Sequence, residues 1–179
     1  MQHIVKSNNI SADTENAVKN INHDKLFILT DEHTHIHCLP LINESDSIKE
    51  AKEIIIPADD KNKTIESLNH IWSKLSSSGA TRHSLLINLG GGMVTDIGGF
   101  AAATFKRGIK YINIPTTLLG AVDAAVGGKT GINFGGYKNE IGAFHPSKRV
   151  IISTGFFHTL DHKAILSGYA EMIKHALIH

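Results

Sequence analysis

The chain has 179 residues, 41% hydrophobic and 20% charged, and a formal net charge of +1 at pH 7. This near-neutral balance, without a charged tail or low-complexity tract, does not favour nucleic acid as the main partner. The N-terminal stretch MQHIVKSNNIS lacks the apolar run of a signal peptide, and no stretch of about 20 apolar residues could span a bilayer. The only cysteine, Cys38, has no partner within the chain. We therefore expect a cytoplasmic protein that needs neither a membrane nor a nucleic acid.

Five short apolar runs have the length and β-branched content of buried strands. They lie at 25–30 (KLFILT), 53–57 (EIIIP), 83–89 (HSLLINL), 111–115 (YINIP) and 149–153 (RVIIS). Between the second and third runs, residues 64–75 place apolar side chains at helical spacing. The alternation of strands and helices predicts an α/β fold, with a mostly parallel sheet covered by helices on both faces. After Thr154 the strand signal ends, and we expect helix from there on.

A glycine-rich segment, LGGGMVTDIGGFAAATF at 89–105, follows one predicted strand and opens a helix. At such a position the backbone amides and the helix dipole can bind a diphosphate. The match to G-x-G-x-x-G is incomplete, because Thr95 occupies the third glycine position. The segment is therefore either a nucleotide site or a tight structural turn. A second segment, GGKT at 127–130, is not a Walker motif, because Asp123 stands where the leading glycine is required.

Polar and basic residues gather beside glycines and turns in the second half of the chain. They are Arg107, Lys129, Lys138 and Asn139, in the contexts KRG, GGKTG and GGYKN. Each could simply be solvated. Taken with Asp123 and Lys174, they are typical of a site for a small molecule with several negative charges. A binding module and an enzyme both remain open on these residues alone.

The C-terminal segment GYAEMIKHALIH places Glu171, Lys174, His175 and His179 at spacings of three and four, so that on a helix they share one face. A helical metal row of Glu171 with the two histidines is one interpretation. A partly exposed structural role for both histidines is the other. The histidines in HTHIHC at 33–38 would share a face only on a strand, and no ligand set nearby completes a metal site with them.

Residues 89–179 resemble the N-terminal half of the 3-dehydroquinate synthase family of sugar phosphate cyclases. The resemblance rests on GGGMVTDIGGFAAATFKRG, YINIPTTLLGAVDAAVGGKTGIN, GGYKNEIGAFHPSKRV and GYAEMIKHA, in the family's order and spacing. Residues 57–72 also look like the family's earlier cofactor segment. The resemblance implies a Rossmann-like NAD-binding domain over 1–154. It also implies the start of a helical metal- and substrate-binding domain at 155–179, whose remainder would lie beyond this chain, and a homodimer.

The resemblance also implies roles for single residues toward NAD. Gly91, Gly92, Met93, Val94 and Asp96 would contact its diphosphate region, and Thr116 and Thr117 would lie near it. Asp60 and Lys63 would bind the adenosine ribose, and Asp31 with His33 would lie at the adenine end. Phe156, Phe157, His158 and Thr159 would close over the cofactor, and Asp123, Lys129 and Lys138 would also contribute to its site.

The substrate groups of the family fall on Arg107, Asp123, Lys129, Lys138, Asn139, Glu171 and Lys174. Glu171 would in addition be a ligand of the active-site metal, Zn²⁺ or Co²⁺. The implied reaction converts a seven-carbon keto acid phosphate into 3-dehydroquinate with loss of phosphate, using NAD⁺ catalytically. The family's other two metal ligands are histidines far downstream, so we expect this chain alone to retain no stoichiometric metal and to catalyse no cyclisation.

Two further functions are compatible with the same residues. Another sugar phosphate cyclase, or a related metal-dependent polyol dehydrogenase, would carry a similar glycine turn. A stand-alone nucleotide-binding module would need only the residues up to 117. The segments GGKTGIN and GGYKNEIG favour the dehydroquinate enzyme over the other cyclases and the polyol dehydrogenases.

Overall fold

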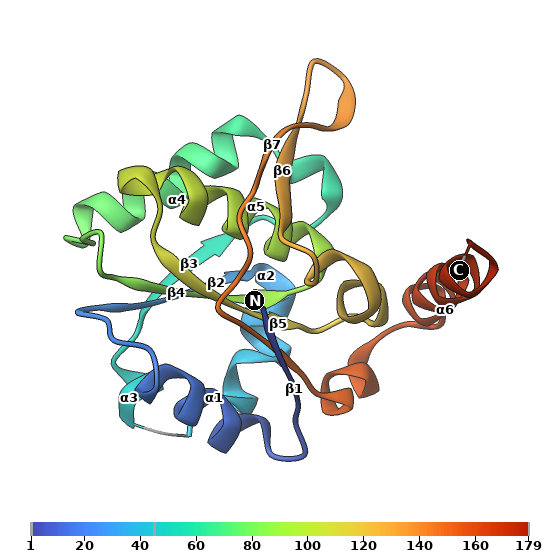
Figure 1. Ribbon diagram of the computed structural model, residues 1–179, viewed down its shortest axis with the longest axis horizontal. Helices are drawn as coiled ribbons and strands as arrows, with labels where there is room; N and C mark the ends of the chain where they lie inside the picture. Colours follow the sequence, from blue (N-terminus) through green and yellow to red (C-terminus); the bar gives the residue numbers. More distant parts are fainter. Residues whose placement is uncertain (1, 45, 179) are drawn as a thin grey trace.

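A six-stranded sheet forms the centre of the molecule, seen in the computed structural model, which describes residues 2–44 and 46–178 (Figure 1). The strand order is β1-β8-β5-β4-β2-β3, and every neighbouring pair in this sheet is parallel. The strands are β1 (His3–Lys6), β2 (Leu26–Asp31), β3 (Lys52–Ile56), β4 (Leu85–Gly90), β5 (Lys110–Pro115) and β8 (Arg149–Ile152). The predicted parallel α/β sheet is thus confirmed.

Helices cover both faces of the sheet. One face carries α4 (Ile65–Ser77) and α5 (Gly92–Thr104), and the other carries α1 (Ile10–Lys19) and α3 (Asp46–Lys49) (Figure 1). The remaining helical segments are α2 (Glu32–His37), α6 (His162–Ile178) and the short turns η1 (Leu39–Leu41), η2 (Asp60–Asn62), η3 (Phe105–Arg107), η4 (Gly120–Ala124) and η5 (Thr154–Thr159). In the described residues, no helix combines the length and apolarity needed to cross a membrane.

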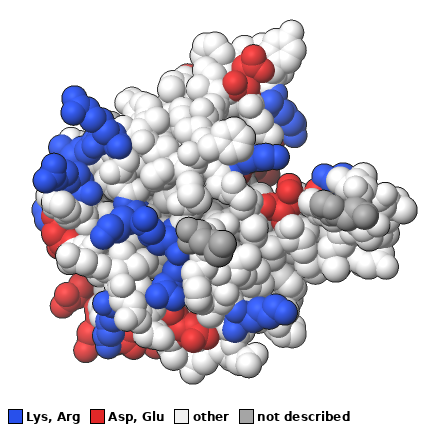
Figure 2. All heavy atoms as spheres, viewed as in Figure 1, with Lys and Arg blue, Asp and Glu red and all other residues white. Residues whose placement is uncertain are grey.

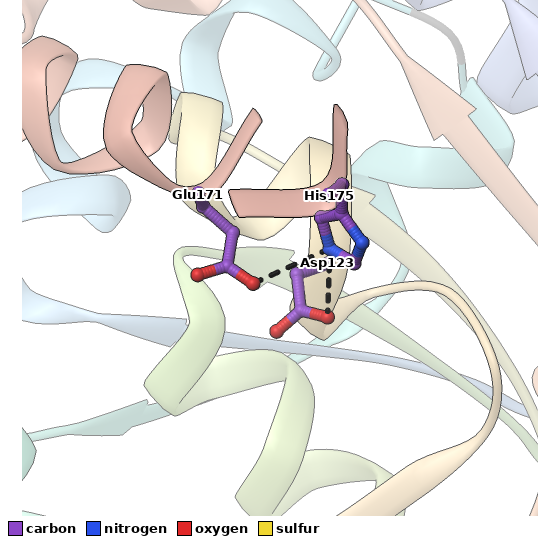
Figure 3. A group of neighbouring side chains, drawn as sticks. All are labelled: Asp123, Glu171 and His175. Carbon is purple, nitrogen blue, oxygen red and sulfur yellow. Dashed lines mark ion pairs between the residues drawn. The ribbon is translucent and has the colours of Figure 1, made fainter. Parts of the chain in front are cut away.

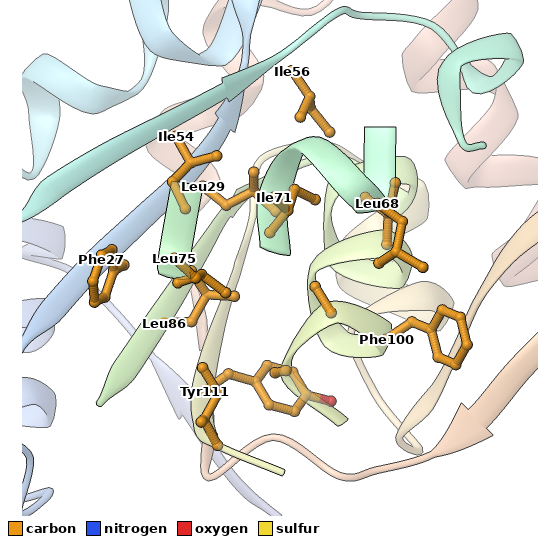
Figure 4. Packing of buried hydrophobic residues seen from close by; sticks show 14 of the residues in the cluster. Phe27, Leu29, Ile54, Ile56, Leu68, Ile71, Leu75, Leu86, Phe100 and Tyr111 are labelled. Atoms are coloured by element: carbon orange, nitrogen blue, oxygen red, sulfur yellow. The ribbon is translucent and has the colours of Figure 1, made fainter. Parts of the chain in front are cut away.

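Side-chain alternation along the strands divides the core into two layers. On β2, Phe27 and Leu29 pack against α4 and α5, whereas Leu26 and Ile28 face the opposite layer. Successive side chains of a strand point to opposite faces, so a strand buried on both sides is apolar throughout. Figure 4 shows the first layer, where Leu68, Ile71 and Leu75 of α4 lie beside Phe100 of α5 and Tyr111 of β5. Burial of these side chains drives the assembly of helices on sheet.

The five predicted strands and the predicted helix at 64–75 are present within two residues of their expected bounds. Thr64 caps α4, since its side chain accepts a hydrogen bond from Ser67 N. The helical segment expected after Thr154 is also present as η5 and α6, as far as Ile178. His179 lies outside the described residues. The segment HTHIHC is mostly the helix α2, which begins with a capping box of Asp31 and Thr34.

A hairpin that the sequence pattern did not predict projects from the body next to α5 (Figure 1). It pairs β6 (Lys129–Phe134) with β7 (Tyr137–Phe144) in an antiparallel arrangement. Most of β7 is exposed, so neither its composition nor its periodicity carries the usual signal of a buried strand. The hairpin nevertheless packs closely on α5 at Gly99. A Cβ added at this glycine would lie only 2.4 Å from Thr130 Cγ2. Only glycine allows this approach.

The C-terminal helix α6 lies to one side of the body (Figure 1) and contacts η4. Its buried residue is Gly168, where a Cβ would lie 2.6 Å from Leu118 Cγ and from Leu119 N. This close contact brings the next turns of α6 over Asp123. That residue 155 begins a second domain remains a prediction, because the position of α6 against η4 does not test it.

Candidate active site

A cavity of about 640 Å³ lies where α5, η4, the β6–β7 hairpin and α6 meet. Its polar and charged lining comes from each of these segments: Asp96, Asp123, Lys129, Thr130, Asn139 and His175. Figure 2 shows α6 as a lobe set apart from the body, with acidic and basic atoms in the hollow between them. Groups from distant parts of the sequence thus converge on one cavity of a size suited to a small molecule.

The glycine turn lies at the start of α5, beside the carboxyl end of β4. Gly91 caps α5 without a side-chain hydrogen bond, so the first amides of the helix depend on water or a ligand for their partners. A Cβ at Gly90 would lie 2.5 Å from Val94 Cγ2, and one at Gly91 would lie 3.1 Å from Thr117 Cγ2. The turn is therefore both tightly packed and open to an anion. Crevices at the carboxyl ends of parallel strands are the usual ligand sites of such sheets.

A buried lysine joins the residues assigned to the cofactor with those assigned to the substrate. Lys63 is 4% exposed, and its ammonium donates hydrogen bonds to Asp96 Oδ2 at 2.9 Å and to the side chain of Asn139. It also lies 3.7 Å from Asp60 Oδ1, and the Lys138 ammonium lies 2.8 Å from Asp60 Oδ2. Three elements, η2, α5 and β7, are thereby held together by one network.

The pKa values of the two carboxylates in this network, Asp96 and Asp60, are shifted in opposite directions. Burial raises the pKa of Asp96, although the Lys63 ammonium partly offsets that effect. The hydrogen bond from Lys138 lowers the pKa of Asp60, which is far more exposed to water. The buried Lys63 thus acts to lower the pKa of both carboxylates, and the exposed Lys138 adds to that effect at Asp60.

A second cluster joins α6 to η4 (Figure 3). His175 Nε2 lies 3.3 Å from Glu171 Oε1 and 3.6 Å from Asp123 Oδ1. Glu171 also forms an ion pair with Lys174, and its hydrogen bond raises the pKa of that lysine. One ligand atom each from Asp123, Glu171 and His175 lies within 4.8 Å of the others. This set of two carboxylates and an imidazole suits a divalent metal such as zinc.

Several predicted site residues lie at or near the start of α5 and the cavity, and their roles remain predictions. Gly91, Gly92, Met93 and Val94 form the turn into α5, and Asp96 follows one turn later. Thr117 Oγ1 accepts a hydrogen bond from Gly120 N at 3.0 Å, whereas Thr116 is buried. Lys129 and Asn139 line the cavity, while Lys138 is 78% exposed beside Asp60. The structure thus brings Asp96, Asp123, Lys129 and Asn139 together at one cavity.

Other predicted residues are not brought to the cavity. Arg107 follows the C-terminal end of α5, and the 13 residues of that helix separate it from the glycine turn by about 20 Å. The Asp31 carboxylate accepts hydrogen bonds from the His33 and Thr34 amides at the start of α2. Phe156 is buried in the core layer opposite α4, with Phe157 packed partly against it. Their predicted roles remain untested, as do those of His158 and Thr159 beside them in η5.

The sequence left His175 with two interpretations, a metal row with Glu171 or a structural role, and did not include it among the predicted site residues. In the structure it lines the cavity and contacts both neighbouring carboxylates. Its spacing of four from Glu171 was the available signal. The contribution of Asp123 could not be read from spacing, because it comes from another element. Cys38 does not line the cavity. Burial raises the pKa of its thiol to about 11, so it is an unreactive core side chain.

Comparisons with known proteins agree with one another. Residues 53–167 match the family model described as 3-dehydroquinate synthase N-terminal. The 3-dehydroquinate synthase of Parabacteroides distasonis is 54% identical over 177 residues, which are 99% of this chain and 50% of that protein. That of Clostridium tetani is 44% identical over 154 residues, 86% of this chain and 41% of that protein. The chain thus spans about half the length of the curated relatives it matches.

Solved structures give the same fold. The 2-epi-5-epi-valiolone synthase of Streptomyces hygroscopicus subsp. jinggangensis, solved with NAD⁺ and Zn²⁺, aligns with a TM-score of 0.86 at 30% identity, over 97% of this chain and 49% of that one. A 2-deoxy-scyllo-inosose synthase, solved with carbaglucose-6-phosphate, NAD⁺ and Co²⁺, aligns with a TM-score of 0.85 at 22% identity, over 96% of this chain and 48% of that one. The second likeness establishes the shared fold alone.

Proposed function

The chain belongs to the 3-dehydroquinate synthase family, and from this premise we propose that its protein converts a seven-carbon keto acid phosphate into 3-dehydroquinate with release of phosphate. NAD and a divalent metal, Zn²⁺ or Co²⁺, would be its cofactors. The observation that carries the proposal is the cavity, which is lined by Asp96, assigned to the cofactor, and by residues assigned to the substrate, Asp123, Lys129 and Asn139. Glu171, assigned to the metal, lies beside its lining residue Asp123. We further propose that the protein is a cytoplasmic homodimer.

The glycine turn and the network around Lys63 support a dinucleotide site. Uncapped amides at the start of α5 can accept the diphosphate, and Asp60, 43% exposed, can accept hydrogen bonds from ribose hydroxyls. The related valiolone synthase was solved with NAD⁺ and Zn²⁺. When bound, NAD⁺ would accept a hydride and the metal would make a substrate hydroxyl more acidic.

The remaining residues of the cavity support an anionic substrate. Lys129 lines it from β6, and the Asn139 side chain is held by Lys63 at a fixed place on β7. A lysine ammonium stabilises phosphate without losing its proton, and a preorganised amide adds a hydrogen bond of defined direction. Glu171 of α6, beside Asp123, would hold the metal at the same cavity.

We expect the protein that carries this chain to release inorganic phosphate from the keto acid phosphate only when NAD⁺ and a divalent metal are present. The assay should run in parallel with sedoheptulose 7-phosphate and glucose 6-phosphate. Turnover of one of these sugars instead would assign the chain to another cyclase of the same group. Oxidation of a polyol without phosphate release would indicate a dehydrogenase, and binding of NAD without any turnover a nucleotide-binding module.

Lys129→Ala should reduce turnover by about a hundredfold, because an ammonium that stabilises developing charge is lost from the cavity. Its side chain is exposed, so the melting temperature should change by a few degrees at most. Lys74→Ala, at an exposed position on α4, is the matched control and should keep full turnover. Normal turnover by the Lys129→Ala variant would show that this lysine does not act in the site.

Asp60→Ala should weaken NAD binding about tenfold, since a carboxylate that accepts hydrogen bonds from the ribose is worth about 1.5 kcal/mol. Isothermal titration with NAD⁺ measures the change. Asp46→Ala removes a fully exposed carboxylate distant from the glycine turn and should leave the affinity unchanged. Equal affinities in all three proteins would exclude Asp60 as the ribose ligand.

A further inference from the structure

We propose that Asn133 is a positioning residue of the active site, which orients Asn139 toward the substrate and ties it to the cofactor segment at η2. Asn133 is the last residue of the segment GGKTGIN, lies near the end of β6 and is not among the predicted site residues. This role rests on the proposed function, which assigns Asn139 to the substrate and Asp60 with Lys63 to NAD. Three hydrogen bonds of Asn133, one to each of these residues, support it.

Asn133 contacts the three assigned residues through three different atoms. Its backbone amide donates a hydrogen bond to Lys63 O at 2.8 Å, and its side-chain Nδ2 donates one to Asp60 O at 3.1 Å. Its Oδ1 accepts a hydrogen bond from the Asn139 amide at 3.0 Å. One half-buried side chain thus joins η2 to β7. The contact needs both ends of an amide, because aspartate of the same size supplies only acceptors and leucine supplies neither group.

The backbone around Asn139 explains why its amide needs such a partner. The pairing of β6 with β7 is irregular between Ile132 and Phe134, so Asn133 lies at a break in the ladder. Asn139 has a φ of +55° within β7. Asparagine adopts this left-handed conformation more readily than most residues, but the conformation turns its amide away from a regular ladder. The side chain of Asn133 supplies the acceptor that this amide requires.

Lys63 determines which end of the Asn139 side chain remains available to a ligand. An ammonium can only donate, so its contact must be with Asn139 Oδ1. Among the described residues, Asn139 Nδ2 donates to no protein acceptor, although Asn139 lines the cavity. Its two N–H groups are thus available to the phosphate or carboxylate oxygens of a bound substrate. Lys63 orients the side chain, and Asn133 fixes the backbone from which that side chain projects.

A purely structural role for Asn133 is the alternative, in which its hydrogen bonds only stabilise the hairpin. Such a role predicts an effect on turnover that does not depend on Asn139. A positioning role predicts that the effect disappears once Asn139 has no side chain left to orient. A double-mutant cycle on the two asparagines distinguishes these cases, because only interacting residues have non-additive effects.

Asn133→Leu should lower kcat/KM for the keto acid phosphate at least tenfold at saturating NAD⁺, since misplacement of a group by about 1 Å can reduce a rate by about 100-fold. In the Asn139→Ala background, the same change should lower kcat/KM by less than about threefold. Asn133→Asp keeps the acceptor for the Asn139 amide and should retain more turnover than Asn133→Leu. Both variants lose the donor to Asp60 O, so isothermal titration should show NAD⁺ binding weakened about fivefold.

Asn20→Leu is the matched control. It removes an exposed asparagine whose Nδ2 donates two hydrogen bonds at the C-terminal end of α1, on the other face of the sheet. Its turnover and its affinity for NAD⁺ should equal those of the wild type. Circular dichroism of each variant verifies that the fold is retained.

The outcomes separate this role from the proposed function. If the wild type turns over the keto acid phosphate and Asn133→Leu equals it in turnover and NAD⁺ affinity, the positioning role is refuted and the proposed function stands. Losses that multiply in the Asn133→Leu, Asn139→Ala double variant also refute it. If Asn133→Leu weakens NAD⁺ binding but the wild type turns over no keto acid phosphate, the tie to η2 is supported and the proposed function fails.

Discussion

Lys63→Ala is expected to destabilise the protein by about 3 kcal/mol, because it removes the cation from a buried ion pair and leaves the partner behind. The Lys63 side chain is 5% exposed and that of Asp96 is 20% exposed. Their contact at 2.9 Å therefore has little competition from water. Urea unfolding of the variant and the wild type measures the difference.

The loss should depend on pH in a defined direction. Burial already raises the pKa of Asp96, and removing Lys63 removes the groups that lower it, so the pKa rises further. A carboxyl whose pKa is raised by folding favours the native state at low pH and loses that contribution as the pH rises through the native pKa. The Lys63→Ala variant should therefore be closest to the wild type in acid and fall increasingly below it toward neutral pH.

Two further proteins test this account. Lys61→Ala removes a lysine whose side chain is 77% exposed, and its stability should change by less than about 0.5 kcal/mol. Replacing Asp96 with Asn in the Lys63→Ala background should recover part of the lost stability, because the unpaired buried charge is gone. A loss in Lys63→Ala that is independent of pH, and is not relieved by Asp96→Asn, would contradict the role given to the ion pair.

Gly98→Ala should cost about 3 kcal/mol or more, despite the better helix propensity of alanine. A Cβ at this position of α5 would lie 2.1 Å from Asn88 Oδ1 and 2.8 Å from Leu29 Cδ2. Both neighbours belong to the fully buried centre of the sheet, where an inserted methyl group costs about 1–3 kcal/mol or more. The gain of about 1 kcal/mol in helix propensity does not offset this.

The displaced side chain makes the effect larger. The Asn88 amide donates a hydrogen bond to Asn113 Oδ1 at 3.0 Å, between β4 and β5, and neither residue can reach water if it moves. Gly155→Ala is the control, since its Cβ would lie 3.4 Å from Ser153 Oγ, an ordinary contact. Thermal unfolding of both variants provides the comparison. A Gly98→Ala variant as stable as the control would show that α5 can move away from the sheet.

Local patterns in the sequence determined five of the six strands of the sheet, all but the mostly exposed β1. The apolar runs at 25–30, 83–89 and 111–115 could be recognised because a strand buried on both faces is hydrophobic throughout. The glycine turn could be placed for the same local reason, since it lies between one such run and a helix. The motifs around it also carried the family resemblance, which the comparisons confirmed.

Contacts between distant segments were decided only by the tertiary structure. The resemblance assigns Lys63 to the ribose of the cofactor, a role that remains a prediction. Its buried network with Asp96 and Asn139 depends on the packing of η2, α5 and the hairpin. The hairpin has an exposed second strand and so left no hydrophobic pattern to recognise. From the sequence alone, the glycines of α5 are only poor helix formers. The structure shows that they allow the sheet and the hairpin to approach the helix closely.

In the cluster of Asp123, Glu171 and His175, one part could be predicted from the sequence and the other depends on the tertiary structure. The sequence by itself determined that Glu171 and His175 share a helix face, because a spacing of four always does so on a helix. That Asp123 completes the group depends on how η4 and α6 pack, which is decided by the close contact at Gly168. Periodicity reports neighbours along one element, whereas convergence of elements depends on which side chains are small enough to let their backbones meet.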